Sequence, residues 1–266
     1  MVTSEQAIKL EELIRKVGDL LIPYWPGDKS SPKGQALVIY DKADGSKVTE
    51  ADLAANEVLV EGLRALFPND AIVSEEGPKD EGHQSMSRVW IIDPLDGTHS
   101  FIAGRDDFSV LVGLSVDSKV VWGGMYFPLK GIYAQASVGQ GAQLSDNTVG
   151  KVSDSLKIRD KCIYHRYCDL KQGNLLFPEW MDSGMAFLAL CRGEFDGMVM
   201  RMQSHQEWDF AAPAALVAES GGVMTDETGA PIRFNQGKIA FRYLVVSNGK
   251  VHRQLLELIE ASEQAA

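Results

Sequence analysis

Two aspartates on one predicted turn give this sequence its strongest chemical signal. Asp93 and Asp96 stand in the stretch Asp-Pro-Leu-Asp-Gly-Thr, directly after the apolar residues 90–92. The apolar run predicts a strand that ends at Asp93, and Pro94 and Gly97 predict an abrupt turn that returns Asp96 to its side. Two carboxylates so placed suit a hard divalent cation such as Mg²⁺, which prefers oxygen ligands. An Asx turn with solvated aspartates is the structural alternative, and this stretch alone leaves both open.

Three more acidic residues stand at the ends of predicted elements. Glu75 follows the strand expected over residues 71–74, so its carboxylate also lies at a strand end. Asp209 opens an alanine-rich helix, and Asp52 follows Thr49 at the spacing of a capping box. Helix capping is the structural alternative for both aspartates, because a capping carboxylate satisfies amides that lack helical partners. Each residue alone leaves the two roles open, but the recurrence of acids at element ends calls for a common explanation.

The first half of the chain must position most of these acids. Apolar spacing predicts an amphipathic helix over residues 4–25, with Thr3 and Gln6 at capping-box spacing, and a second helix over 49–66. A loop rich in glycine, proline and serine is expected at 27–34. Turn signals between short β-rich runs predict an antiparallel meander. These runs are residues 71–74, 89–93, 108–116, 120–126 and 131–136.

Helices and strands alternate in the second half, which predicts an α/β arrangement after an α+β first half. The expected strands are 162–164, 197–200 and 243–247, and the expected helices are 183–191, 210–219 and one from residue 251. No repeat or flexible linker separates the halves. We therefore expect two subdomains that pack as one unit: residues 1–148 with most of the acids, and residues 149–266 with Asp209 and the substrate-side residues.

Composition and charge limit the possible partners. The chain has 266 residues, of which 45% are hydrophobic and 24% charged, as is ordinary for a soluble globular protein. The net charge of −11 argues against a nucleic-acid polymer as partner, because binding the phosphate backbone requires basic surfaces. A small phosphorylated molecule would meet the same repulsion unless bound cations reversed the local charge.

We expect a cytoplasmic protein with no membrane partner. No apolar run reaches the roughly 18 residues that a membrane-spanning helix requires, and the first residues lack the apolar core of a signal peptide. The three cysteines, Cys162, Cys168 and Cys191, are odd in number and lack a CxxC spacing. This pattern is typical of reduced thiols rather than of disulfides or a zinc site, with a redox pair of Cys162 and Cys168 as the alternative.

Four segments, in order, resemble the inositol monophosphatase family. DPLDGT at 93–98, preceded by Trp-Ile-Ile and followed by Phe101, is similar to the family's first signature, and WDFAAPAALVAESGG at 208–222 is similar to the second. VTEAD at 48–52 and SEEG at 74–77 fit the same pattern. The likeness covers nearly the whole chain. It implies a layered αβαβα sandwich, the fold shared with fructose-1,6-bisphosphatase.

The resemblance further implies a Mg²⁺-dependent phosphomonoester hydrolase. By position, Glu75, Asp93 and the carbonyl oxygen of Leu95 would hold one Mg²⁺, and Asp93, Asp96 and Asp209 a second. Glu75 would also help to place a third, weaker ion. Mn²⁺ is an alternative to Mg²⁺, and Li⁺ would inhibit.

The catalytic residues implied by the resemblance are Asp52, Thr98 and Glu75. Thr98 and Asp52 match the pair that positions and deprotonates the attacking water, so hydrolysis would need no covalent phosphoenzyme. The amides of Gly97 and Thr98 would face the phosphate oxygens. The remaining residues implied to bind substrate are His99, Ser183, Gly184 and Asp209.

The substrate is less sharply indicated. Family members act on inositol monophosphates, 3′-phosphoadenosine 5′-phosphate, histidinol phosphate or fructose bisphosphate. Leu95, the segment 104–108 and Glu207 favour the 3′(2′),5′-bisphosphate nucleotidase branch, whereas His99 and the segment 182–187 depart from it. We predict conversion of 3′-phosphoadenosine 5′-phosphate to AMP, with inositol 1-phosphate or another small sugar phosphate as the alternative.

Other features stay open at the level of sequence. The segment 161–180 matches no branch of the family; its His165, Arg166 and Lys171 could contact a second phosphate or a sugar, or could form a mixed-charge surface. His205 could face the substrate or the solvent. A non-catalytic binder of metal or phosphate is the alternative from another class, and the presence of all the acidic residues argues against it. A homodimer is possible.

Overall fold

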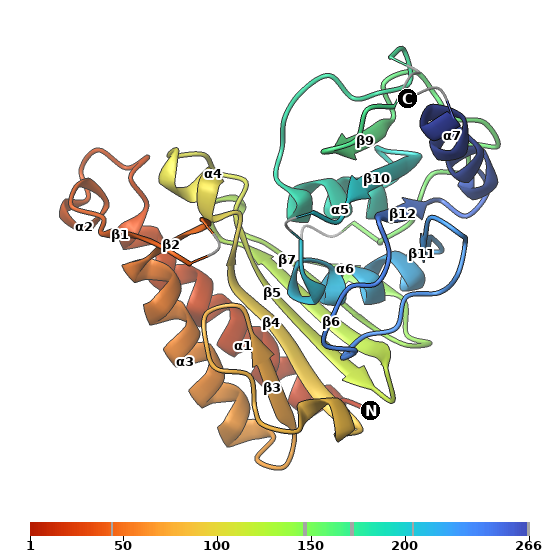
Figure 1. Cartoon of the computed structure of the whole chain (residues 1–266). Coiled ribbons are helices and arrows are strands. Elements are labelled where there is room, and N and C mark those ends of the chain that lie inside the picture. The colour runs from red at the N-terminus through yellow and green to blue at the C-terminus, as the bar shows by residue number, and fades with distance from the viewer. Residues whose placement is uncertain (44, 146–147, 171–172, 204, 265–266) are drawn as a thin grey trace.

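Helices and sheets stack in the order helix, sheet, helix, sheet, helix in this computed structural model (Figure 1). The predicted layered αβαβα sandwich is therefore confirmed. The structure describes residues 1–266 apart from 44, 146–147, 171–172, 204 and 265–266. One sheet has six strands in the order β3-β4-β5-β6-β7-β8, and the other has four in the order β11-β12-β10-β9.

The six-stranded sheet contains the predicted meander. Its strands are β3 (Ala71–Ser74), β4 (Arg88–Asp96), β5 (Ser109–Val116), β6 (Lys119–Phe127), β7 (Ile132–Ser137) and β8 (Ala142–Leu144). Strands β4 to β8 pair antiparallel in sequence order, and β3 joins the edge parallel to β4. The sequence had not predicted β8, which is only three residues long.

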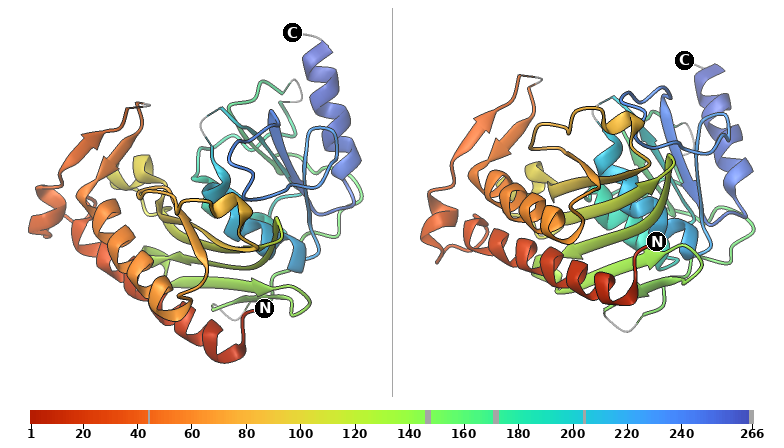
Figure 2. Two further views of the ribbon diagram at one scale, coloured as in Figure 1. Left: turned by 60° about the horizontal axis from the view of Figure 1, so that its bottom comes forward. Right: turned by 90° about the horizontal axis from the view of Figure 1, so that it is seen from below.

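Two helices cover the outer face of this sheet side by side (Figure 2). α1 (Ser4–Leu21) has the predicted capping box of Thr3 and Gln6, and it continues as a short 3₁₀ turn, Ile22–Tyr24. α3 (Glu50–Leu66) begins after Thr49, whose side chain accepts hydrogen bonds from the amides of Ala51 and Asp52. Their buried side chains form one core with the sheet, because apolar residues recur at helical spacing.

Two helices separate the sheets and a third covers the far side. α5 (Ser183–Cys191) and α6 (Glu207–Glu219) are buried on nearly all sides, as expected for a middle layer. The four-stranded sheet consists of β9 (Ile163–Arg166), β10 (Gly197–Arg201), β11 (Val223–Asp226) and β12 (Tyr243–Ser247), in which only the β9–β10 pair is parallel. α7 (His252–Gln264) packs on its outer face through Leu255 and Ile259.

The sequence did not predict several short elements of the N-terminal half. A hairpin of β1 (Ile39–Asp41) and β2 (Lys47–Thr49) precedes α3, and the loop expected at 27–34 runs into a helical turn, α2 (Pro32–Gln35). The exposed residues of β1 carry no alternation of buried and exposed side chains that could reveal a strand. The three cysteines are free thiols. Within the described residues, no helix combines the length and apolarity needed to cross a membrane.

Candidate active site

A cavity of about 650 Å³ opens between the two sheets, and all five predicted metal ligands line it. We call one part the acidic wall; it consists of Glu75, Asp93, Asp96, Asp182 and Asp209. We call another part the β9–β10 wall; it consists of residues that end or follow these two strands, namely Arg166, Tyr167, Gln203 and His205.

β4 delivers both aspartates of the predicted turn to the same face of the sheet. Val89 and Ile91 pack toward α6, so Asp93, two residues further along the strand, points the same way. A regular strand would turn Asp96 to the opposite face. The pairing with β5 is irregular at this point: Asp93 pairs with Leu111 and Asp96 with Ser109, so three residues of β4 match two of β5. This bulge returns Asp96 to the cavity side, where its Oδ2 accepts a hydrogen bond from Ser109 Oγ at 3.0 Å.

The chain reverses at Gly97, which corrects the turn predicted from Pro94. β4 continues through Pro94 to Asp96, because the bulge accommodates a residue that has no N–H to donate. Gly97 has a φ of +86°, and a β-carbon there would lie 2.8 Å from Cγ of Asp182. Both constraints require glycine at this position. The short helix α4 (Thr98–Ile102) starts immediately afterwards, and Gly97, Thr98 and His99 all line the cavity.

Asp209 reaches the same space from α6. Gln206 is the N-cap of this helix, which begins earlier than the residue 210 expected from the sequence. Asp209 is the third residue of the helix and takes part in its capping box, because it accepts a hydrogen bond from the backbone N–H of Gln206 at 2.6 Å. Carboxylate oxygens of Asp93, Asp96 and Asp209 lie within 4.8 Å of one another. Residues more than 100 positions apart in sequence thus form a compact cluster of oxygen donors.

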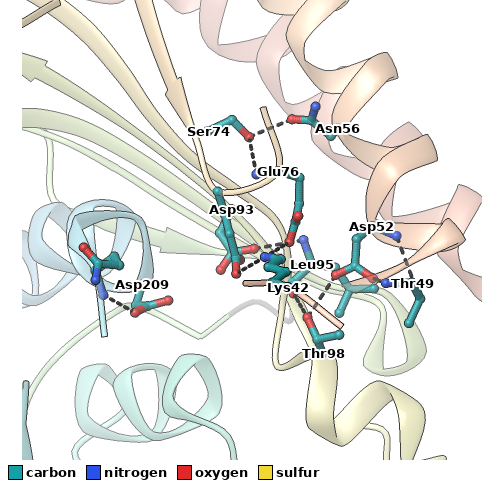
Figure 3. A network of polar contacts seen from close by, with 12 residues as sticks. Lys42, Thr49, Asp52, Asn56, Ser74, Glu76, Asp93, Leu95, Thr98 and Asp209 are labelled. Carbon is teal, nitrogen blue, oxygen red and sulfur yellow. Dashed lines mark hydrogen bonds and ion pairs between the residues drawn. The ribbon is translucent and has the colours of Figure 1, made fainter. Parts of the chain in front are cut away.

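Lys42, which the sequence analysis had not singled out, contacts the acidic wall. It follows β1, and its Nζ lies 2.9 Å from Glu75 Oε1. The same Nζ lies 2.6 Å from Glu76 Oε1 (Figure 3). Burial, followed by the charge of Glu75, raises the pKa of Glu76 to about 7. Lys42 is separated from Glu75 by 33 positions and from Glu76 by 34 positions. No local sequence pattern links residues so far apart, so these contacts could not be expected from the sequence.

The electrostatics of the acidic wall favour a bound cation. Burial raises the pKa values of Asp93, Asp96 and Asp209 well above the usual value, and neighbouring carboxylates raise them further. The Lys42 ammonium shows that a positive charge fits beside Glu75. Clustered carboxylates are the ligands that Mg²⁺ and Mn²⁺ prefer, so the donor set fits either ion.

Thr98 and Asp52 form a direct hydrogen bond at the start of α4 (Figure 3). Thr98 Oγ1 lies 2.9 Å from Asp52 Oδ1 and 3.2 Å from the carbonyl oxygen of Leu95. The other carboxylate oxygen of Asp52 accepts hydrogen bonds from the amide and hydroxyl of Thr49. Asp52 therefore has both roles that the sequence left open: it completes a capping box, and it contacts the predicted catalytic threonine. Burial raises the pKa of its carboxyl group.

Asp182 is a further acidic residue that sequence reasoning had not assigned to the site. It caps α5 by accepting a hydrogen bond from the Gly184 amide, and its own amide donates to Asp107 Oδ2 at 2.9 Å. Ser183, which was predicted to bind substrate, lines the cavity. Gly184, also predicted to bind substrate, packs behind Asp96: a β-carbon there would lie 2.5 Å from Asp96 Oδ2. The absence of a side chain at Gly184 allows α5 to pack close to the acidic wall.

The β9–β10 wall carries different chemistry. Side chains alternate along β9, so Arg166 shares the face of Tyr164 and points into the cavity, and His165 lies on the other face. His205, which the sequence left between substrate and solvent, is 8% exposed and lines the cavity. Lys171 lies outside the described residues.

Two features that had favoured the nucleotidase branch lie outside the cavity. Glu207 accepts hydrogen bonds from the backbone amides of Asn235 and Gln236. In the segment 104–108, Arg105 pairs with Asp107 and contacts Trp180, and Phe108 is buried in the core. These residues have structural roles outside the cavity. Their presence therefore does not support one substrate over another.

Comparisons with known proteins agree with the resemblance. The model of the inositol monophosphatase family matches residues 4–264. A histidinol-phosphatase from Chlorobaculum parvum is 31% identical over 95% of this chain and 96% of its own length. The 3′(2′),5′-bisphosphate nucleotidase CysQ from Escherichia coli K12 is 30% identical over 84% of this chain and 91% of its own.

Solved structures show the same fold. An IMPase from Thermotoga maritima superimposes with a TM-score of 0.82 at 24% identity, and the match covers 99% of each chain. The relatives that match in sequence include phosphatases with different named substrates, so the comparisons define the reaction class and leave the substrate unassigned. This chain belongs to the inositol monophosphatase family and is a phosphatase.

Proposed function

We propose that this phosphatase is a Mg²⁺-dependent phosphomonoesterase that converts 3′-phosphoadenosine 5′-phosphate to AMP. The observation that carries the proposal is the make-up of the cavity. Carboxylates of Asp93, Asp96 and Asp209 cluster on its acidic wall, and Arg166 brings a guanidinium group to its β9–β10 wall. A substrate with two phosphates fits both: one at the acidic wall through cations, the other near Arg166.

The acidic wall would hold the cations. Asp93, Asp96 and Asp209 are the central ligands, with Glu75 and the Leu95 carbonyl oxygen beside them. When bound, Mg²⁺ supplies positive charge to the phosphoryl oxygens and makes a water molecule more acidic. Li⁺ is expected to compete for the same oxygens and to inhibit.

Thr98 would orient the attacking water and Asp52 would withdraw its proton. The Thr98 hydroxyl donates its hydrogen toward Asp52 Oδ1, so its lone pairs remain to accept a hydrogen from water. The raised pKa of Asp52 makes its carboxylate a stronger base than an exposed aspartate. A proton released by the water can thus pass through Thr98 Oγ1 to Asp52 without a covalent intermediate.

Inositol 1-phosphate is the alternative substrate. Two of the three sequence features that favoured the nucleotide, Glu207 and the segment 104–108, lie away from the cavity. The preference for the nucleotide therefore depends on Leu95 and on the β9–β10 wall.

Phosphate release in the presence of Mg²⁺ tests the proposal. We would compare 3′-phosphoadenosine 5′-phosphate, inositol 1-phosphate, histidinol phosphate and fructose 1,6-bisphosphate at equal concentrations. Preference for the nucleotide supports the proposal, and preference for another substrate replaces its substrate assignment. Absence of release from all four would contradict the proposed reaction.

A further inference from the structure

The β9–β10 wall has the features of a binding subsite. We infer that Arg166 and Tyr167 bind the non-reacting part of the substrate, and that this part contains an aromatic ring and a second anionic group. The inference rests on the proposed function and deepens it, because it assigns the specificity of the site to two residues outside the family's signature motifs.

The sheet topology places this subsite. β9 and β10 are parallel neighbours, so their carboxyl ends meet at one edge of the sheet. Arg166 and Tyr167 come from the end of β9, and Gln203 and His205 follow the end of β10. Crevices beside the carboxyl ends of parallel strands are common ligand sites in α/β structures. All four residues line the cavity that also contains the acidic wall.

Arg166 brings an incompletely satisfied positive charge to this wall. Its Nη1 donates to the carbonyl oxygen of Met181 at 3.3 Å, while its Nε is buried and has no hydrogen-bond partner among the described residues. The guanidinium carbon lies 4.8 Å from the ring centroid of Trp180 and 5.2 Å from that of Tyr167. These rings fix the plane of the guanidinium group, and a fixed guanidinium is suited to bind phosphate.

Tyr167 presents an aromatic surface next to this charge. Its φ is +55°, a conformation that is uncommon for a bulky residue and that often marks functional positions. The residue is 50% exposed and lines the cavity, and its ring centroid lies 5.8 Å from that of His205. An aromatic side chain left half exposed beside a cavity is a surface on which a base can stack.

His205 adds a neutral polar group. Burial, together with the charge of Arg166, lowers the pKa of its imidazole to about 4, so the ring is uncharged at neutral pH. Its Nδ1 is buried without a hydrogen-bond partner among the described residues. A neutral imidazole beside an exposed tyrosine ring complements a heteroaromatic ring that carries donors and acceptors. A polyol such as inositol has no aromatic face to stack on the tyrosine ring.

The alternative explanation for Arg166 is structural. Arg166 donates a hydrogen bond to Met181, the residue directly before Asp182. In this explanation the guanidinium group only holds Asp182 of the acidic wall in place. A subsite residue affects only ligands that reach the subsite, whereas a positioning residue affects every substrate. The two explanations therefore predict different substrate dependence.

Binding of AMP to the wild-type protein measures the subsite without turnover. AMP carries the aromatic ring and the second phosphate, and saturating inorganic phosphate with Mg²⁺ would fill the acidic wall. We would determine Kd by calorimetry and, in parallel, kcat/KM for inositol 1-phosphate, which lacks both groups.

We expect Arg166→Met and Tyr167→Ala each to weaken AMP binding about ten-fold or more, the range of one charge-assisted hydrogen bond or one stacked base. The loss in kcat/KM for inositol 1-phosphate should be clearly smaller than the loss in AMP affinity, because this substrate carries neither the ring nor the second phosphate that the subsite would contact. Tyr167→Phe keeps the ring and should bind as wild type. Arg105→Met is the matched control, because Arg105 stacks on Trp180 at 4.0 Å but lies outside the cavity.

Equal AMP affinity in Arg166→Met and Arg105→Met would overturn the inference, as would absence of AMP binding to wild type. A parallel loss of AMP binding and of inositol 1-phosphate turnover would make Arg166 a positioning residue. Tyr167 is exposed, so its variants remain informative if Arg166→Met fails to fold. Wild-type protein that binds AMP but hydrolyses no monoester would contradict the proposed function and leave the subsite standing.

Discussion

The acidic wall and the β9–β10 wall share one cavity but are built in different ways. On the acidic wall, sheet and helix geometry fixes two of the carboxylates: a bulge in β4 places Asp96, and the first turn of α6 places Asp209. Beside this wall, a capping box holds Asp52, which contacts Thr98. On the β9–β10 wall, Tyr167 and His205 lie beyond the ends of their strands, and Tyr167 has a left-handed backbone conformation. One wall depends on the sheet and helices, and the other on turns that can vary without altering the fold.

The acidic wall and the β9–β10 wall also differ in charge. The acidic wall gathers several carboxylates, and burial and their mutual repulsion raise their pKa values. When these groups are ionised, the wall has an excess of negative charge that bound cations would offset. The other wall combines the guanidinium of Arg166 with a neutral His205. The proposed function and the proposed subsite together imply that reaction and recognition are separated in space. Changes on the acidic wall should slow every substrate, and changes on the β9–β10 wall should alter the choice among substrates.

Asp93→Asn provides the strongest test of this separation. Asp93 is central to the carboxylate cluster, so its loss removes a charge that stabilises the cations. We expect kcat to fall at least about 10²–10³-fold with every substrate, the range for losing a key electrostatic group. Phosphate release at saturating Mg²⁺ checks this, with the exposed Asp154→Asn as control. Retention of a tenth of the activity would show that Asp93 is not a required ligand.

Thr98→Ala should have the next largest effect. The variant loses the hydroxyl that contacts Asp52 but keeps every carboxylate, so Mg²⁺ should bind normally. We expect kcat to fall about 10²-fold for all substrates, in the range of general-base contributions. Thr98→Ser keeps the hydroxyl and should retain most of the activity. Normal turnover in Thr98→Ala would remove this residue from the proton path.

The sequence was sufficient to predict most of the acidic wall. Apolar runs ending in acids indicated strands that deliver Glu75 and Asp93, and motif resemblance added Asp209 from the second half. The positions of α1, α3 and β3 also followed from caps and periodicity. The bulge that returns Asp96 to the cavity was not predicted, because Pro94 and Gly97 indicated a turn and gave no information on strand register.

Contacts between distant segments could not be predicted where no family motif marks them. Lys42 meets Glu75 through a hairpin too short and exposed for its pattern to be recognised, and Asp182 reaches Gly97 because α5 lies between the sheets. The sequence suggested Arg166 as a contact to a second phosphate or a sugar but left a mixed-charge surface open, and it did not single out Tyr167. The parallel pairing of β9 and β10 places both residues beside His205. Local spacing carries no record of such tertiary pairings.

The charge difference between the regions should appear in stability. Carboxyl groups with raised pKa values bind protons more readily in the folded than in the unfolded state, so the metal-free protein should gain stability as pH falls from 8 toward 5.5. Asp196, remote from the acidic wall, behaves oppositely: despite burial, hydrogen bonds from Arg159 and Ser153 lower its pKa, and its stabilisation is lost only in stronger acid.

Thermal unfolding in EDTA measures this effect. We expect Tm to be about 2–4 °C higher at pH 5.5 than at pH 8 for each kcal/mol of relieved repulsion. Saturating Mg²⁺ should remove the rise, because the cations already offset the charge, and Asp93→Asn should reduce it. A metal-free Tm that falls steadily from pH 8 to 5.5 would contradict the inferred excess of buried charge.

Lys42→Met should have the smallest effect, and it tests whether the acidic wall is already partly neutralised by the protein itself. The Lys42 ammonium occupies Glu75 and Glu76, so an incoming cation must displace it from Glu75. Partly exposed ion pairs contribute up to about 1 kcal/mol, so the variant should reach half-maximal activity at about two- to five-fold less Mg²⁺. The shift should be equal for all substrates, because Lys42 acts on the acidic wall.

Lys47→Met, on the same hairpin but paired with Asp41, is the matched control. A higher Mg²⁺ requirement in Lys42→Met would instead mean that the ammonium stabilises the cation-loaded wall, and a shift confined to nucleotide substrates would break the separation between the two walls.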